Sequence, residues 1–206
     1  MKNRACFGNI GWVFVLMVFL LAGCSTTPGV RYYTLNPSAE MQPDIPQAVS
    51  GDTLAIGVGP VEFPKFLDRP QIVTRQSQNR IEVSEFNRWA GSFSEDFLRV
   101  LAKNISMLLP ADRVAAYPWT DQFSPTYRIQ LTVEQFDGRF GGNVLLNVTW
   151  SVWNQKDTNE LVMKHTSIKE PLSTEGYESL VEAQSRAIGT LSRVIVDEIE
   201  RVSHRD

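Results

Sequence analysis

The side chain best suited to covalent chemistry in this sequence is the thiol of Cys24. An apolar run that begins near Ile10 follows two basic residues and ends directly before this cysteine. The basic residues are Lys2 and Arg4, and the last three residues of the run are Leu21, Ala22 and Gly23. About a dozen apolar residues after a basic start are too few to span roughly 30 Å of hydrocarbon, so they are typical of a cleaved secretory signal.

The four residues Leu21-Ala22-Gly23-Cys24 resemble a bacterial lipobox. In that motif the cysteine thiol receives a diacylglycerol, cleavage falls just before the cysteine, and the new N-terminus is acylated. We therefore predict that residues 1–23 are a lipoprotein signal peptide and that Cys24 is the lipid attachment site. Each buried methylene contributes about 0.8 kcal/mol, so several acyl chains on one cysteine anchor a domain firmly. The alternative is an ordinary cleaved signal followed by an incidental cysteine.

The residues around the cysteine also predict a compartment. Ser25 stands where an aspartate would resemble the inner-membrane retention signal, so the resemblance implies the periplasmic face of the outer membrane. Cys6 leaves with the signal and Cys24 is acylated, so no internal disulfide is expected even in an oxidising compartment. The fold must therefore be stabilised by its hydrophobic core.

The composition excludes nucleic acid as a partner. Removal of the 23-residue signal leaves 183 of the 206 residues, which is enough for one sizeable domain. The signal carries two bases and no acid, so the formal side-chain charge falls from −3 to −5 in the mature chain. An acidic chain without a long basic block lacks the electrostatic footprint of a nucleic-acid-binding protein.

A search for catalytic or metal-binding residues is negative. The sequence has two histidines, His165 in a strand-like pattern and His204 in a polar tail, and a packed or solvated role is favoured for both. Neither a glycine-flanked serine nucleophile nor a HExxH motif occurs. We predict no catalytic residue, no metal site and no cofactor other than the covalent lipid on Cys24.

The hydrophobic pattern predicts a single α/β domain over residues 32–206, after a lipidated tether at 24–31. A Pro-rich loop is expected at 36–52. Strands are expected at 32–35, 54–58, 71–76, 80–84, 114–117, 127–134, 144–152 and 161–168. Amphipathic helices are expected from Phe93 to Leu108, after a Ser92 cap, and from Tyr177 to Val202, near a Ser173/Thr174 cap. This order indicates a two-layer sandwich, in which two main helices pack on a mixed, mostly antiparallel sheet.

The first strand determines how closely the domain is held to the lipid. If residues 32–35 dock into the sheet, about seven residues separate the lipid from the domain, a reach of about 25 Å. If the chain as far as Asp52 is unstructured, the average distance is about 30 Å and the stretched distance is far greater. We favour the short tether.

Four apolar loop residues are candidates for a protein or lipid contact. Phe63, Phe66 and Leu67 flank Pro64 in one loop, and Phe140 lies at a glycine-rich hairpin tip. The competing interpretation is that they fold back onto the core of the domain, as most loop aromatics do.

A set of short strings resembles the PqiC family, the paraquat-inducible auxiliary lipoproteins of ABC-type transport. The strings follow one another over nearly the whole mature chain, and their order makes the set specific. They include Tyr32-Tyr33-Thr34-Leu35, Val58-Gly59-Pro60-Val61, Leu67-Asp68-Arg69-Pro70-Gln71-Ile72-Val73-Thr74-Arg75, Asn79-Arg80-Ile81 and Phe86-Asn87-Arg88-Trp89-Ala90. We expect structural roles for the matching residues Tyr32, Tyr33, Asp68, Arg69, Pro70, Arg75, Arg88 and Trp89. Asn87 departs from the histidine that the family often has there, which argues against catalysis at that position.

The resemblance implies a non-enzymatic subunit of an MCE-type intermembrane phospholipid transport system. Such a subunit would dock the distal end of a tunnel-forming MCE-domain protein at the outer membrane. A homo-oligomeric ring is expected, because a cyclic tunnel tip is matched most simply by a cyclic partner. Two alternatives remain open: a structural or regulatory lipoprotein that acts on cell-wall or envelope machinery, and, with less support, a periplasmic hydrolase.

Overall fold

The computed structural model describes residues 29–38, 54–109, 111, 113–154 and 159–203. The predicted signal peptide, Cys24 with its lipobox, most of the predicted Pro-rich loop and His204 lie outside these ranges. None of the helices in the described ranges combines the length and the apolar composition needed to cross a membrane.

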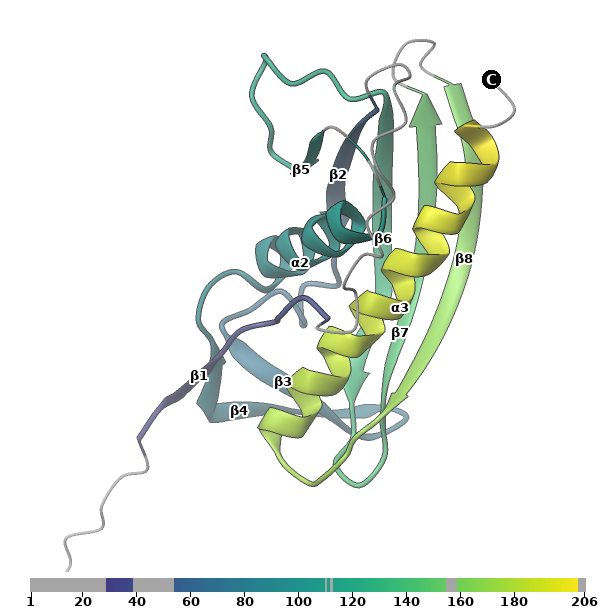
Figure 1. Cartoon of the computed structure of the whole chain (residues 1–206). Coiled ribbons are helices and arrows are strands. Elements are labelled where there is room, and N and C mark those ends of the chain that lie inside the picture. The colour runs from purple at the N-terminus through teal and green to yellow at the C-terminus, as the bar shows by residue number, and fades with distance from the viewer. Residues whose placement is uncertain (1–28, 39–53, 110, 112, 155–158, 204–206) are drawn as a thin grey trace, which may run out of the picture.

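The larger of the two sheets has five strands in the order β5-β2-β6-β7-β8 (Figure 1). Strand β2 runs parallel to both of its neighbours, whereas β6, β7 and β8 form an antiparallel meander. The strands are β2 (Ala55–Glu62), β5 (Arg113–Ala116), β6 (Tyr127–Gly138), β7 (Asn143–Asn154) and β8 (Asn159–Pro171).

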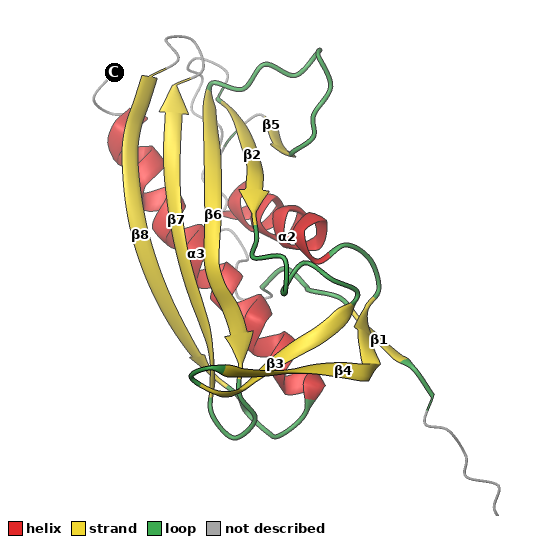
Figure 2. Cartoon of the chain, turned by 180° about the vertical axis from the view of Figure 1, so that it is seen from behind, coloured by secondary structure: helices red, strands yellow, loops and turns green. Residues whose placement is uncertain are grey.

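The smaller sheet has three strands in the order β1-β4-β3. They are β1 (Arg31–Tyr33), β3 (Gln71–Ser77) and β4 (Arg80–Trp89), and β1 runs parallel to β4 while β3 pairs with it as an antiparallel hairpin. Figures 1 and 2 show this sheet lying across the lower end of the larger sheet, with β1 at one side and the β3–β4 turn at the other. We call this end the N-terminal pole; it contains β1, the turns at 77–79 and 139–142, and the start of α3.

Two helices, α2 (Phe93–Leu108) and α3 (Tyr177–Ser203), cover one face of the larger sheet (Figure 2). Helix α2 starts where expected, because the Ser92 side chain accepts a hydrogen bond from the Glu95 amide. The expected cap of α3 at Ser173/Thr174 is wrong. The helix begins after Gly176, whose carbonyl accepts from the amide of Leu180, and Ser179 turns back to accept from the amide of Thr174.

The core forms because apolar residues alternate along the strands that face the helices. From Val144 to Val152, every second residue of β7 is buried against the helices, and the residues between them are half-buried except Ser151, which is buried. The buried set on this strand is Val144, Leu146, Val148, Trp150 and Val152. They pack against the apolar stripes of α2 and α3 in one continuous core.

The expected α/β class and both helices are confirmed, and all eight expected strands are present. The structure differs from the expectation in dividing the strands between two sheets. Two irregularities lengthen strands beyond their predicted ends. A register shift between Val58 and Val61 carries β2 past Pro60, and a bulge between Val133 and Gln135 carries β6 on to Gly138. The second irregularity breaks the alternation of period two on which the prediction depended.

The edge strand β8 is tied to α3 by an ion pair between Lys164, whose side chain is 38% exposed, and Glu198, whose side chain is 12% exposed. Lys164 donates to a carboxylate oxygen of Glu198, which also accepts from Arg201 at 2.9 Å. The hydrogen bond from Lys164 is the largest influence on this carboxyl and lowers the pKa of Glu198 below its ordinary value, against the opposing effect of burial.

This pair predicts a pH dependence of stability. The folded-state pKa of Glu198 is lowered, so its contribution is fully present above the unfolded value of about 4.3 and is lost as the pH falls through the folded value. Urea unfolding should show that Glu198→Gln lowers the free energy of unfolding at pH 7 and that this deficit shrinks below pH of about 4.3. The exposed Glu200 on the same helix provides the matched control, Glu200→Gln. A Glu198→Gln deficit that stayed constant with pH would contradict this role.

Candidate functional site at the junction of the two sheets

The two sheets are joined at the N-terminal pole by an ion pair between Arg75 and Asp137. The Arg75 side chain, on β3, donates through Nε to both carboxylate oxygens at 2.9 and 3.0 Å and through Nη2 to one of them at 2.6 Å. Asp137, on β6, is almost completely buried, with 1% of its side chain exposed. The hydrogen bond with Asp137 is the main cause that raises the pKa of Arg75 above its ordinary value. The planar guanidinium thus satisfies a buried carboxylate in a geometry that a lysine cannot reproduce.

A chain of polar side chains extends from this pair over the face of the larger sheet that the helices do not cover. Gln135 donates to Asp137 at 2.8 Å, Asn147 donates to Gln135 at 3.4 Å, and Ser167 donates to Asn147 at 2.7 Å. These residues lie on β6, β7 and β8. The pole is therefore held together by polar contacts on one face and by the apolar core on the other.

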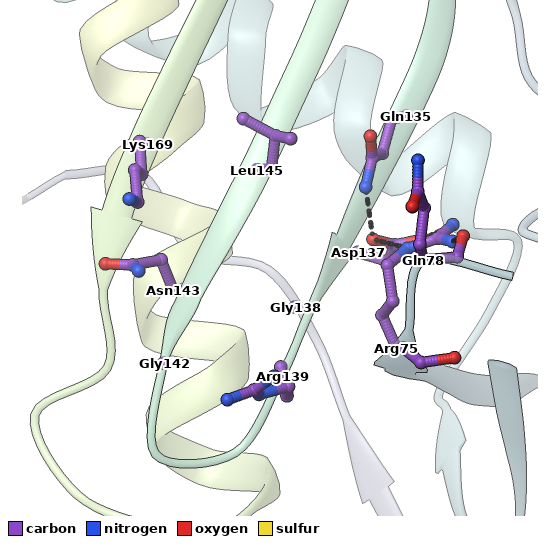
Figure 3. A pocket seen from close by; sticks show the side chains of 11 residues that line it. Arg75, Gln78, Gln135, Asp137, Gly138, Arg139, Gly142, Asn143, Leu145 and Lys169 are labelled. Carbon is purple, nitrogen blue, oxygen red and sulfur yellow. Dashed lines mark hydrogen bonds and ion pairs between the residues drawn. The ribbon is translucent and has the colours of Figure 1, made fainter. Parts of the chain in front are cut away.

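A pocket of about 420 Å³ opens beside the ion pair, between the β3–β4 turn and the β6–β7 hairpin. Figure 3 shows Arg75, Asp137 and Gln78 at one side, Lys169 and Asn143 at the other, and Arg139 at the hairpin. The lining residues are Arg75, Ser77, Gln78, Gln135, Asp137, Gly138, Arg139, Gly142, Asn143, Leu145 and Lys169. Three cations and a single acid give the lining a net positive charge.

Glycines set the geometry of the hairpin that borders the pocket. A Cβ on Gly138 would lie 2.6 Å from a methyl of Leu180 and 2.9 Å from one of Val144, so a glycine lets β6 approach α3 closely. Gly141 has a φ of 68°, in the left-handed region that glycine adopts without strain. The hairpin can therefore turn tightly enough to bring Arg139 to the edge of the pocket.

The side chains that line this pocket are suited to binding an anion. It has no histidine or cysteine, and its only acid is held by Arg75. Across the described residues, no cluster of three or more His, Cys, Asp or Glu side chains could hold a metal ion. Arg139 and Lys169 are exposed and make no ion pair with the described part of the chain, so they are available to an anion.

A second pocket, of about 500 Å³, lies between the chain that follows β1 and helix α3. Its lining includes Glu178, Glu182 and Arg186, so its charged groups have no excess of positive charge. The charges that line this second pocket therefore favour neither an anion nor a cation as clearly as those of the pocket at the sheet junction favour an anion.

The four apolar residues proposed for a partner contact differ in exposure. Leu67 is 3% exposed because the loop folds back onto the core, as the competing interpretation expects. Phe63 is also packed inward, at 5.3 Å between ring centroids from both Phe93 and Phe97. Phe140 is half-buried against Tyr177 at 5.0 Å. Only Phe66 of the four is classed as exposed, at 37%, so the contact stays a prediction with Phe66 as its best test.

The residues of the PqiC-like motifs that lie on β1 and near the end of β4 make structural contacts. Tyr33 donates its hydroxyl to the side chain of Asn87 at 3.1 Å, which fastens β1 to β4. Trp89 stacks on Phe93 with 4.5 Å between the ring centroids, and the Nε of Arg88 is buried without a hydrogen-bond partner in the described residues. Asn87 thus occupies a structural position.

The motif residues Asp68, Arg69 and Pro70 form a turn before β3. Arg69 donates to Gln71 at 3.2 Å, and the carbonyl of Pro70 accepts from the amide of Trp89 at 2.8 Å. Asp68 lies 3.4 Å from the amide of Ser94 near the start of α2. Tyr32, in contrast, is 66% exposed on β1. The turn therefore connects the smaller sheet to α2.

Three residues of this site, Asp137, Arg139 and Lys169, were not predicted from the sequence. Asp137 lies beyond the expected end of the strand at residue 134 and precedes a glycine, whereas in the structure it is buried near the end of β6. The pairing of Asp137 with Leu145, and of Leu145 with Lys169, aligns these residues in one row across β6, β7 and β8. A register assignment that included the bulge after Val133 could have placed Asp137 and Lys169 in this row.

Comparison with known proteins identifies the family of this fold and site. Residues 33–196 match the family described as ABC-type transport auxiliary lipoprotein component. The chain belongs to this family. It is 24% identical over 192 residues to the intermembrane transport lipoprotein PqiC of Escherichia coli K12, covering 93% of this chain and 98% of that protein. The resemblance to the PqiC family that the motifs suggested is confirmed, and the chain is an ABC-type transport auxiliary lipoprotein component.

Two solved structures share the fold. A crystal structure of an uncharacterised protein matches with a TM-score of 0.68 and 21% identity, covering 84% of this chain and 99% of that chain. A Xanthomonas campestris protein matches with a TM-score of 0.65 and 12% identity, covering 85% and 98% of the respective chains. The arrangement of two sheets and two helices is therefore shared by distant sequences.

The ion pair between the sheets predicts a large effect of removing one partner. Arg75→Met leaves the Asp137 carboxylate buried without its main partner, so it should lower the free energy of unfolding by about 3–5 kcal/mol. Arg75→Met combined with Asp137→Leu should recover part of this loss, because no buried charge remains. Urea unfolding followed by tryptophan fluorescence measures both effects.

The matched control is Arg80→Met, which removes an exposed arginine from the same hairpin and should change stability by less than about 0.5 kcal/mol. If Arg75→Met were as mild as this control, the two sheets would not depend on the ion pair.

Proposed function

We propose that this protein is an outer-membrane-anchored periplasmic subunit of an MCE-type system that moves phospholipids between membranes. It would dock the distal end of a tunnel-forming MCE-domain partner at the outer membrane. The observation that carries the proposal is membership of the transport auxiliary lipoprotein family over residues 33–196. The lipobox at Cys24 and the serine that follows it support the outer membrane as the site of anchoring.

The position of β1 supports the short tether. Arg31, where β1 begins, is seven residues after Cys24, so a fully extended connection reaches about 25 Å. The N-terminal pole would then face the membrane, and the opposite end of the larger sheet would point into the periplasm. A domain held in this orientation can receive a partner that approaches from the periplasmic side.

The protein would act by positioning its partner and would not catalyse a reaction. The family is named for an auxiliary role in transport, and the pocket at the sheet junction is lined by groups that bind anions. A homo-oligomeric ring around the tunnel axis would give the partner a matching symmetric receptor, because cyclic assemblies are met most simply by cyclic assemblies. Phe66 would contribute to the partner contact from its loop at the edge of the core.

The anchor can be tested by Cys24→Ala. The variant should fold but fractionate away from the outer membrane, and phospholipid transport measured in cells at native expression should fall to the level of a deletion strain. Cys6→Ala is the matched control, because this cysteine lies within the predicted signal and should be dispensable. Full transport by Cys24→Ala would show that the anchor is not part of the mechanism.

The partner contact can be tested by Phe66→Asp. A charge on this exposed side chain should abolish co-purification with the MCE-domain protein while the far-UV circular dichroism spectrum stays unchanged. Met163→Asp is the matched control, because Met163 is 58% exposed on β8, away from this loop. Retained co-purification of Phe66→Asp would remove Phe66 from the contact.

A further inference from the structure

The pocket at the sheet junction combines features that select an anion. Arg139, in the turn between β6 and β7, and Lys169, on β8, both line the pocket. Neither side chain has an ion-pair partner among the described residues. The amide side chains of Gln78 and Asn143 also line it and make no side-chain hydrogen bond to the described part of the chain. Two cations and two amide donors are thus available around one cavity.

The only carboxylate in the lining does not cancel this charge. Both oxygens of Asp137 accept hydrogen bonds from Arg75, and one also accepts from Gln135. Because Asp137 and Arg75 neutralise each other, Arg139 and Lys169 remain as the uncompensated charges of the pocket. The ion pair forms the wall of the pocket, and these two residues provide its attraction for an anion.

The size and composition of the pocket favour a phosphate group that carries an organic substituent. A volume of about 420 Å³ lies within the range of pockets that hold small molecules. Guanidinium and ammonium groups together suit the non-bridging oxygens of a phosphate. Leu145 lies in the lining between Lys169 and Asp137 in the strand register and supplies an apolar surface for a glycerol backbone.

The position of the pocket is also suited to a lipid headgroup. It lies at the N-terminal pole, beside the β3–β4 turn and the β6–β7 hairpin (Figures 1 and 3). The smaller sheet places β1, which follows the predicted lipid anchor, across the same end of the molecule. A membrane that holds the anchor would therefore present its phosphates on the side of the molecule where the pocket opens.

We propose that the pocket lined by Arg139, Lys169, Gln78 and Asn143 is a phosphate-binding site that takes the phosphodiester of a phospholipid headgroup or a free phosphate. This rests on and deepens the proposed function, because it gives a transport lipoprotein a recognition site for the cargo or for the membrane surface.

The test is calorimetric titration of the purified, detergent-solubilised full mature protein with three soluble probes. These are inorganic phosphate, glycerophosphoglycerol, which is a phospholipid headgroup without acyl chains, and glycerol. Both phosphate-bearing probes should bind and glycerol should not. The double variant Arg139→Gln/Lys169→Met should bind them at least about tenfold more weakly, because it loses two charge-assisted contacts.

The matched control is Lys103→Met/Arg193→Gln, which removes one lysine and one arginine from exposed helix positions and leaves the pocket intact. It should bind as the unmodified protein does, which separates a local site from a general effect of net charge. Unchanged thermal unfolding of both double variants establishes that the fold is preserved.

The outcomes distinguish the two sources of the phosphate. Tighter binding of glycerophosphoglycerol than of inorganic phosphate supports a lipid headgroup, and equal binding supports a free phosphate. Absence of saturable binding, or binding that survives in Arg139→Gln/Lys169→Met, overturns the proposal. Co-purification of the same variant with the MCE-domain partner reports on the proposed function separately, so either idea can fail alone.

Discussion

The structure depends on the way a small sheet is fastened across the end of a larger one. The fastening has a polar half, in which Arg75 pairs with the buried carboxylate of Asp137. It also has an apolar half, a stack of three aromatic rings. The ring centroids of Trp89 and Phe93 lie 4.5 Å apart, and those of Phe93 and Phe136 lie 5.6 Å apart. The apolar half joins β4, the start of α2 and β6 through non-directional packing. The polar half adds direction, because a bidentate pair is satisfied in only one arrangement of the two strands.

The strands of the larger sheet and both helices could be predicted because their signals are local. Alternation over Val144 to Val152 defines a strand with one buried face, and Ser92 followed by Glu95 marks the start of a helix. The division into two sheets could not be predicted in this way, because a strand carries no local mark of its neighbours. The site was missed for the same reason: a bulge after Val133 reverses which side chains share a face, and Asp137 becomes a buried partner of Arg75 from 62 residues away.

The role proposed for the domain is to position a partner, and the contacts of the residues that match the family fit this role. The family is a set of transport auxiliary lipoproteins, and the residues that motif comparison singled out, such as Tyr33 and Trp89, hold β1 and β4 in place. Holding β1 in place determines where the chain leaves the folded domain toward the lipid. Under the two proposals above, Tyr33 and Trp89 would shape the pole that faces the membrane, and Arg139 and Lys169 would give that pole a preference for phosphate.

The claim on which the rest depends is that the N-terminal pole lies against the membrane. Cys6 and Cys24 are the only cysteines in the sequence. Cys6 would leave with the signal peptide and Cys24 would carry the lipid, so an introduced cysteine would be the single site for a nitroxide label. The label can be placed at Gln78→Cys, in the turn at this pole, or at Asp121→Cys, in the loop between β5 and β6 at the opposite end. Electron paramagnetic resonance of the lipidated protein in vesicles that contain a nickel-chelating lipid measures the distance of each label from the surface. The account predicts strong relaxation of the label at 78 and little at 121. Equal relaxation at both positions, or stronger relaxation at 121, would contradict it.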